Sequence, residues 1–206
     1  MTNKTIGFFG DSFCSSCEEE SWCSIVAKKL NSKIINLGMS GASIWTAIIN
    51  FLDIVENNRL PNYSIFCWTD PYRLYHEKFI ANHSVKITDE NKNIVEASRL
   101  YKLYLSNQKK EHIEYEFVLK YFDKEILKPL ENKTKIYQMW SIAPFELANE
   151  KKHIELQTGC FDNFSLYKFS EWKFIDYKIE EESKLINHMT AEKNKELANK
   201  VLKRLN

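Results

Sequence analysis

The sequence has no apolar run approaching the roughly 18 residues of a membrane span, and its N-terminus has no apolar stretch long enough for a signal peptide. It also has no excess of charge, because 29 Lys and Arg residues face 28 Asp and Glu residues. That balance removes the electrostatic argument for nucleic acid or an anionic membrane as a partner. We therefore expect a soluble protein with a small-molecule partner, located in the cytoplasm, elsewhere inside the cell, or in a virion.

Glycine and proline are scarce, with 5 and 4 residues, and no linker, internal repeat or low-complexity tract divides the 206 residues. A chain of this length fits one domain with a substantial core. The five cysteines are odd in number and lack the regular spacing of a disulfide framework, which favours free thiols in a reducing compartment. We predict a single domain over residues 1–206.

Apolar runs alternate with longer helical patterns, which is typical of βαβ units around a parallel sheet. The segment from about 70 to 110 has a weaker pattern, with some helix around 95–105, and we interpret it as an insertion. Thr190 is placed to cap the last helix. The predicted strands are 5–10, 33–38, 63–68 and 134–142, and the other predicted helices are 18–30, 111–130 and 191–205. A further helix is predicted within 40–57, with Ser40 or Ser43 as its N-cap.

Residues that can carry chemistry follow these strands, and ligands of open parallel sheets bind beyond the carboxyl ends of the strands. Gly10-Asp11-Ser12 follows the first strand, residues 38–41 follow the second, and Thr69-Asp70 follows the third. His188 stands just before the last helix. A hydroxyl nucleophile, backbone donors and an imidazole are therefore expected along one rim.

Four segments, "FFGDSF", "NLGMSGAS", "FCWTD" and "NHMTAEKNKELA", occur in this order along the chain. Together they resemble the SGNH (GDSL-like) hydrolases, a family of esterases and lipases. The resemblance implies a three-layer α/β/α sandwich with a central, mostly parallel, flavodoxin-like sheet. It also implies hydrolysis of a carboxylic ester without a metal or organic cofactor.

By this resemblance, Ser12 is the nucleophile and His188 the base that takes its proton. The Ser12 and Gly41 backbone N–H groups and the side chain of Thr69 are the expected oxyanion donors. Most family members carry Asn where this chain has Thr69, whose shorter hydroxyl donates one hydrogen bond. Supporting roles are expected for Asp11 and Asp70.

The chain departs from the family at a second position, because Leu185 stands where an Asp usually orients the catalytic His. A Ser-His dyad remains workable if a backbone carbonyl or another acid fixes the imidazole of His188. The sequence leaves the choice of acid open among Asp162, Asp176 and Glu181.

Three motifs also allow interpretations other than an esterase. Cys14 and Cys17 could form a thiol pair between a strand and a helix, although the cysteines do not have the spacing of a zinc site. Cys67 and Arg73 match the C-x5-R spacing of cysteine phosphatases, but Pro71 removes a backbone donor that a phosphate loop needs. Ser12 could also be an ordinary helix cap.

The sequence therefore predicts a serine esterase that acts on a small-molecule or glycan ester, with acetyl on a carbohydrate as the preferred substrate by family analogy. The insertion and a few aromatic residues between Trp140 and Trp172 are candidates for a specificity pocket, although most of these aromatics should be core. The rival hypothesis is a ligand-binding protein that has lost catalysis, with Leu185 and Thr69 as traces. The oligomeric state stays open.

Overall fold

A computed structural model describes residues 4–76, 86–108, 111–142, 154–170 and 185–205. Its strands form one five-stranded sheet in the order β2-β1-β3-β4-β5, and every neighbouring pair is parallel. This order is the flavodoxin-like doubly wound arrangement, so the predicted fold class is confirmed. The strands are β1 (Lys4–Gly10), β2 (Ser32–Gly38), β3 (Tyr63–Trp68), β4 (Lys135–Trp140) and β5 (Cys160–Ser165).

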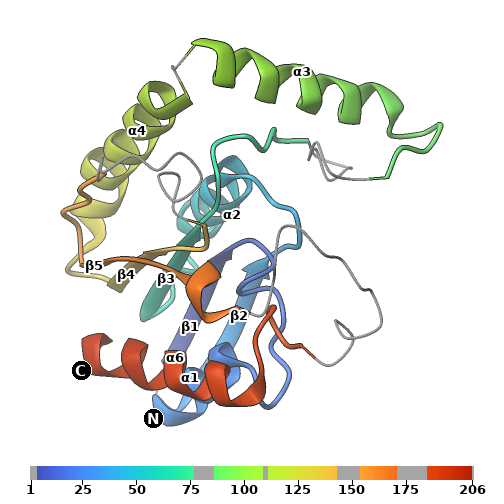
Figure 1. Ribbon diagram of the computed structural model, residues 1–206. Helices are drawn as coiled ribbons and strands as arrows, with labels where there is room; N and C mark the ends of the chain where they lie inside the picture. The colour runs from blue at the N-terminus through green and yellow to red at the C-terminus, as the bar shows by residue number, and fades with distance from the viewer. Residues whose placement is uncertain (1–3, 77–85, 109–110, 143–153, 171–184, 206) are drawn as a thin grey trace.

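Helices cover both faces of the sheet and complete three layers (Figure 1). On one face, α1 (Trp22–Lys29) packs beside α6 (Ala191–Leu205) over a core that includes Phe8, Trp22 and Leu197. On the other face, α2 (Ile44–Glu56) and α4 (Glu111–Tyr121) enclose a second core that includes Phe51, Phe66 and Trp140. Helix α3 (Lys92–Gln108) lies apart from the sheet.

The burial of each element follows from its sequence pattern. Every residue of β3 is buried, as expected of a central strand covered on both faces. In α6 the buried residues recur at helical spacing and form one apolar stripe, with Asn194 as its polar member. Thr190 caps this helix as predicted, because its Oγ1 accepts a hydrogen bond from the Lys193 N–H at 3.3 Å.

Two predicted helices have different boundaries in the structure. The helix expected over 18–30 begins only at Trp22, because the side chain of Ser21 caps it by accepting from the Ser24 N–H. The helix expected over 111–130 is broken into α4, a π-helical segment η1 (Phe122–Leu127) and a 3-10 turn η2 (Lys128–Leu130). The break coincides with the buried carboxylate of Asp123, which accepts hydrogen bonds from Gln138 and from the 157–158 backbone.

The fifth strand was not predicted. β5 carries Cys160, Asp162 and Asn163, and most of its side chains are only partly buried, so it lacks the apolar pattern of the inner strands. A short 3-10 turn, η3 (Leu166–Phe169), follows it. Among the described residues, no helix combines the length and hydropathy that crossing a membrane requires.

Candidate active site

The loop after β1 holds Ser12 at the carboxyl end of the sheet. Gly10 is required where β1 ends, because a Cβ at this position would lie 2.5 Å from the Cys67 carbonyl oxygen on the neighbouring strand. The chain turns immediately afterwards, and the Cys14 N–H donates to the Asp11 carbonyl at 3.1 Å. Ser12 is half-buried in this turn, and its hydroxyl makes no hydrogen bond within the described part of the chain.

The two aspartates expected to support the site are joined by Arg73. Its Nη1 donates to Asp11 Oδ2 at 3.2 Å and its Nε donates to Asp70 Oδ2 at 2.9 Å, and all three side chains are buried. Burial acts to lower the pKa of Arg73, but the two carboxylates outweigh it and raise the pKa above its ordinary value. Breaking a buried pair of this kind typically costs about 3–5 kcal/mol, so Asp11 and Asp70 have a structural use in addition to any role in chemistry.

Arg73 and Asp11 also connect the loops that follow other strands. Arg73 Nη1 donates to the Ala42 carbonyl oxygen at 3.2 Å, in the loop between β2 and α2. Asp11 Oδ1 accepts from the Ser141 hydroxyl at 2.7 Å, directly after β4. The ends of four strands are thereby held together around one buried carboxylate.

Gly41 lies in a tight turn after β2. The Ala42 N–H donates to the Met39 carbonyl at 3.0 Å, and Gly41 has φ of +73° at the third position of this turn. A type II turn needs a residue with positive φ at that position, which explains the glycine. The Met39 N–H donates to the Gly10 carbonyl at 3.0 Å and fixes the turn beside the Ser12 loop.

The three groups predicted as oxyanion donors share one property. Within the described part of the chain, neither the Ser12 N–H nor the Gly41 N–H has a hydrogen-bond partner. Thr69 Oγ1 is buried and also has no partner among the described residues, which is costly for a hydroxyl unless something else binds it. The Thr69 carbonyl, by contrast, accepts a hydrogen bond from the Tyr115 hydroxyl of α4.

His188 lies in a two-residue turn before α6. Ile186 and Met189 exchange two backbone hydrogen bonds of 3.1 and 3.0 Å, and the residues between them, Asn187 and His188, have φ of +53° and +64°. This is the pattern of a type I′ turn, which Asn tolerates well and His rarely adopts. Left-handed backbone at a non-glycine residue is found disproportionately at functional sites.

Two asparagines attach this turn to the rest of the site. Asn187 Oδ1 accepts from the Ser16 N–H at 2.8 Å, and its Nδ2 donates to the Ser16 carbonyl at 3.1 Å. The buried Asn194 donates from Nδ2 to the Ile186 carbonyl at 2.9 Å and accepts at Oδ1 from the Trp22 N–H at 2.9 Å. The turn that carries His188 is therefore bound directly to the loop that carries Ser12.

The imidazole of His188 lies beside the residue that follows the predicted nucleophile. The ring centroids of Phe13 and His188 are 5.0 Å apart, with an angle of 52° between the ring planes. Asp162, one of the three acids considered as its partner, is instead engaged by the Tyr137 hydroxyl at 2.7 Å and by Arg204 at 3.5 Å. The other two candidates, Asp176 and Glu181, lie outside the described residues.

The surroundings of the cysteines give no support to the thiol alternative. Cys14 is buried, and a hydrogen bond with Cys67, followed by burial, raises the pKa of its thiol. Cys17 is half-buried, and its thiol is hydrogen-bonded by Cys23, which lowers its pKa against the opposing effect of burial. Cys67 is a buried strand residue, and the guanidinium of Arg73 is occupied by two carboxylates, so the phosphatase spacing does not form a phosphate loop.

Several site residues were missed by the sequence reasoning. Asn36 holds the nucleophile loop by donating from Nδ2 to the Ser15 carbonyl at 2.6 Å. Arg73 was considered only for its spacing from Cys67 in the sequence, not for its contacts with the two aspartates. Asn194 had a detectable signal, because it is a polar residue in register with the apolar stripe of α6. Trp140 is fully buried core, as expected of most aromatics in that region, whereas Phe145 and Trp172 lie outside the described residues.

Within the described residues, no three His, Cys, Asp or Glu side chains are grouped so that they could hold a metal ion. A search against protein-family models found no match, and a search of curated proteins found none either. Comparison with solved structures found distant similarities.

The psychrotrophic esterase EstA from Pseudoalteromonas sp. is 12% identical with a TM-score of 0.43, over 98% of this chain and 97% of that one. The acetyl xylan esterase Est2A from Butyrivibrio proteoclasticus is 9% identical with a TM-score of 0.45, and the alignment covers 100% of this chain and 64% of the esterase. A G-D-S-L family protein from Desulfitobacterium hafniense is 13% identical with a TM-score of 0.42, over 99% and 100% of the two chains. Similarities this distant assign neither an activity nor a substrate to this chain.

Proposed function

We propose that this protein is a serine ester hydrolase of the SGNH (GDSL-like) type, with Ser12 as nucleophile and His188 as general base. One observation carries the proposal. The Ser12 amide, the Gly41 amide and the buried Thr69 hydroxyl are all without hydrogen-bond partners among the described residues, and they lie on loops joined through Asp11, Arg73 and Ala42. Unpartnered donors on a rigid rim suit an oxygen that becomes negatively charged during reaction.

The position of His188 gives further support. Its turn is fixed to the nucleophile loop by the two hydrogen bonds between Asn187 and Ser16, and its ring contacts Phe13. A base must be held near the hydroxyl that it deprotonates, and the contacts of His188 and its turn with Phe13 and Ser16, which belong to the same loop as Ser12, support this role.

In the proposed reaction, Ser12 Oγ attacks the ester carbonyl carbon while His188 takes the hydroxyl proton. The carbonyl oxygen becomes an oxyanion that accepts hydrogen bonds from the Ser12 and Gly41 amides and the Thr69 hydroxyl. The bond to the leaving alcohol then breaks, and His188 returns the proton to the alcohol oxygen. Finally, His188 deprotonates a water molecule, whose oxygen attacks the acyl carbon. The bond between this carbon and Ser12 Oγ then breaks, the acid leaves, and His188 returns the proton to Ser12 Oγ.

The proposed substrate is a carboxylic ester with a small acyl group, of which acetyl on a carbohydrate is the preferred example. The test is a panel of short p-nitrophenyl esters and acetylated sugars, measured with the full chain and with two variants. Ser12→Ala removes the nucleophile. His188→Asn removes the base but keeps a residue that tolerates the left-handed backbone of the turn, so that loss of activity is not confused with strain.

We expect the two variants to lose nearly the same activity, about 10³-fold or more, because members of one catalytic unit fail together. Retention of most turnover by His188→Asn, with full loss in Ser12→Ala, would remove His188 from the mechanism. Absence of hydrolysis by the wild-type chain over the whole panel would favour the ligand-binding alternative.

A further inference from the structure

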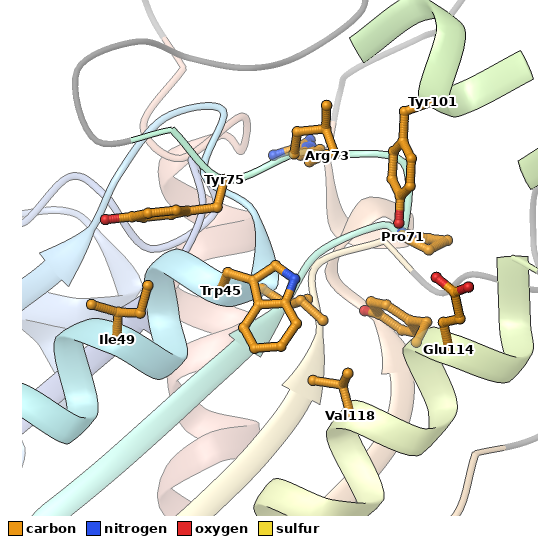
Figure 2. A pocket seen from close by; sticks show the side chains of 11 residues that line it. Trp45, Ile49, Pro71, Arg73, Tyr75, Tyr101, Glu114 and Val118 are labelled. Carbon is orange, nitrogen blue, oxygen red and sulfur yellow. The ribbon is translucent and has the colours of Figure 1, made fainter. Parts of the chain in front are cut away.

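A pocket of about 370 Å³ shares Arg73 and Tyr115 with the hydrogen-bond network of the proposed active site, and the mechanism above does not use it. It is formed between α2, the segment 71–75 that follows β3, and the helices α3 and α4 (Figure 2). Aliphatic side chains, including Ile49 and Val118, line part of its wall. Most of the remaining lining consists of aromatic rings with a few polar atoms, as is usual for small-molecule sites.

The aromatic rings are accessible to a ligand. Trp45 and Tyr75 are 44% and 42% exposed although they lie at the mouth of a largely apolar pocket. Figure 2 shows the indole of Trp45 between Tyr75 on one side and Tyr101 with Glu114 on the other. Flat rings at the edge of an open pocket offer stacking surfaces to a ligand with apolar faces.

Three polar groups of the pocket are not used by the protein itself. Within the described residues, the Trp45 indole N–H, the Tyr101 hydroxyl and the Glu114 carboxylate have no hydrogen-bond partner. Burial, and then the nearby charge of Glu114, raise the pKa of Tyr101, so its hydroxyl stays protonated and can donate at neutral pH. The pocket therefore presents donors and acceptors around apolar surfaces.

The charge of the pocket disfavours an anionic ligand. Glu114 and Arg73 are the charged residues among those that line it, and the Arg73 guanidinium is already paired with Asp70 and Asp11. Among the lining residues that the structure describes, no basic group is left to bind a phosphate or a carboxylate. An uncharged ligand with C–H faces for the rings and hydroxyls for Glu114, Tyr101 and Trp45 matches this set, and a sugar ring has both features.

The pocket is connected to the proposed active site through two residues that line it. Arg73 bonds to Asp11, the neighbour of Ser12, and Tyr115 bonds to the carbonyl of Thr69. We propose that this pocket binds an uncharged sugar ring, which forms the alcohol part of the ester that Ser12 attacks. Binding of a sugar in this pocket does not depend on catalysis. That the bound sugar is the alcohol part of the ester rests on the proposed esterase function.

The test uses ligands without an ester bond, so that binding is measured whether or not the chain hydrolyses esters. The full chain is titrated with methyl β-glucoside, methyl β-xyloside and methyl N-acetyl-β-glucosaminide, and binding is followed by saturation-transfer NMR and isothermal calorimetry. Two other ligands are titrated in the same way. Tetramethylammonium chloride represents cations, since aromatic pockets also bind quaternary ammonium groups, and sodium hexanoate represents an acyl chain. We expect saturable binding of at least one glycoside and weaker binding of both competitors.

Variants locate the binding. Trp45→Ala should weaken glycoside binding about tenfold or more, which corresponds to about 1.4 kcal/mol, because the largest stacking surface is lost. Glu114→Gln should weaken it less, by about threefold, because an amide keeps one oxygen acceptor. Phe117→Ala is the matched control, because Phe117 is an exposed aromatic of α4 that does not line the pocket, and its variant should bind like the wild type.

Three results would overturn the sugar site. These are no saturable binding of any glycoside, glycoside binding that Trp45→Ala leaves unchanged, and tighter binding of tetramethylammonium or hexanoate than of every glycoside. Glycoside binding at Trp45 in a chain without esterase activity would support the sugar site and contradict the proposed function. Esterase activity at Ser12 without glycoside binding would support the proposed function and contradict the sugar site.

Discussion

Thr69 gives the sharpest prediction at the scale of single residues. Its hydroxyl is buried without a hydrogen-bond partner in the part of the chain that the structure describes, and replacing such a group by a methyl group is neutral or stabilising by about 1 kcal/mol. Thr69→Val should therefore fold with an unchanged or raised free energy of unfolding. If the hydroxyl is an oxyanion donor, kcat for ester hydrolysis should nevertheless fall by about 10²-fold. Chemical denaturation and steady-state kinetics of the same preparation check both parts.

Thr134→Val provides the matched control for this prediction. Thr134 is also buried, but its Oγ1 shares a hydrogen bond of 3.0 Å with the Ser64 hydroxyl, before β4 begins and away from the Ser12 loop. We expect this variant to lose about 1 kcal/mol of stability and to keep kcat. Unchanged turnover in Thr69→Val would exclude its hydroxyl from the reaction.

Roles could be predicted from the sequence for residues whose chemical type suggests catalysis. Roles could not be predicted for the residues that hold them in position. Ser12 and His188 stand in segments that resemble a known family, so they could be named before any coordinates. Arg73 could not be assigned, because its two carboxylate partners depend on the way in which separate loops meet. Asn187 could not be assigned either, because its partner Ser16 is 171 positions away in the sequence.

At the scale of elements, the turn before α6 is predicted to control activity through its attachment to the β1–α1 loop. Asn187→Gly keeps a residue suited to φ of +53° but removes two hydrogen bonds to Ser16, at a cost of about 1–2 kcal/mol. Asn187→Ala removes the same bonds and adds about 1 kcal/mol of backbone strain. Both variants should show lower kcat with little change in KM, because the imidazole of His188 is held less well.

Asn31→Gly is the control for this element, because Asn31 also has a positive φ of 49° but follows α1 at the far end of β2. It should leave kcat unchanged. Equal stability and equal kcat in wild type, Asn187→Gly and Asn187→Ala would show that the attachment to Ser16 does not position the base.

Elements stabilised by local sequence features could be predicted, whereas those stabilised by contacts with other parts of the chain could not. α6 was predicted with its cap because its apolar stripe and Thr190 are local features of the sequence. β5 was missed because it is stabilised mainly by pairing with β4, which local pattern does not report. The break after α4 was missed because Asp123 is satisfied by Gln138 and by the 157–158 backbone, which lie in other parts of the chain.

At the scale of the whole molecule, the two cores on opposite faces of the sheet should unfold together if the chain is one domain. Leu197 of α6 and Phe51 of α2 are fully buried, one in each core. Leu197→Ala and Phe51→Ala should each lower the stability of a single transition, by about 2–5 and 3–5 kcal/mol. Urea unfolding followed by fluorescence and far-UV circular dichroism checks this. Separate transitions, with each variant affecting only one, would contradict the single-domain prediction.

The fold class was predictable because alternating apolar runs and amphipathic helices restrict a chain to few arrangements. The pocket beside α2 was not, because Trp45, Tyr75 and Tyr101 come from three segments with no common sequence pattern. The sequence offered two candidate sources of specificity, the 70–110 segment and a few aromatic residues between Trp140 and Trp172. Tyr75 and Tyr101 belong to the first, and no residue of the second is among the described residues that line this pocket.

The central claim is that Ser12 is an activated nucleophile, and covalent labelling tests it most directly. The folded chain is incubated with a fluorophosphonate over a range of pH, and the modified residue is mapped by peptide mass spectrometry. The proposed function predicts one adduct, on Ser12, that is lost in Ser12→Ala, greatly slowed in His188→Asn, and retained in a Cys14→Ser, Cys17→Ser double variant. An adduct confined to another residue, or no adduct at any pH at which the chain is folded, would contradict it.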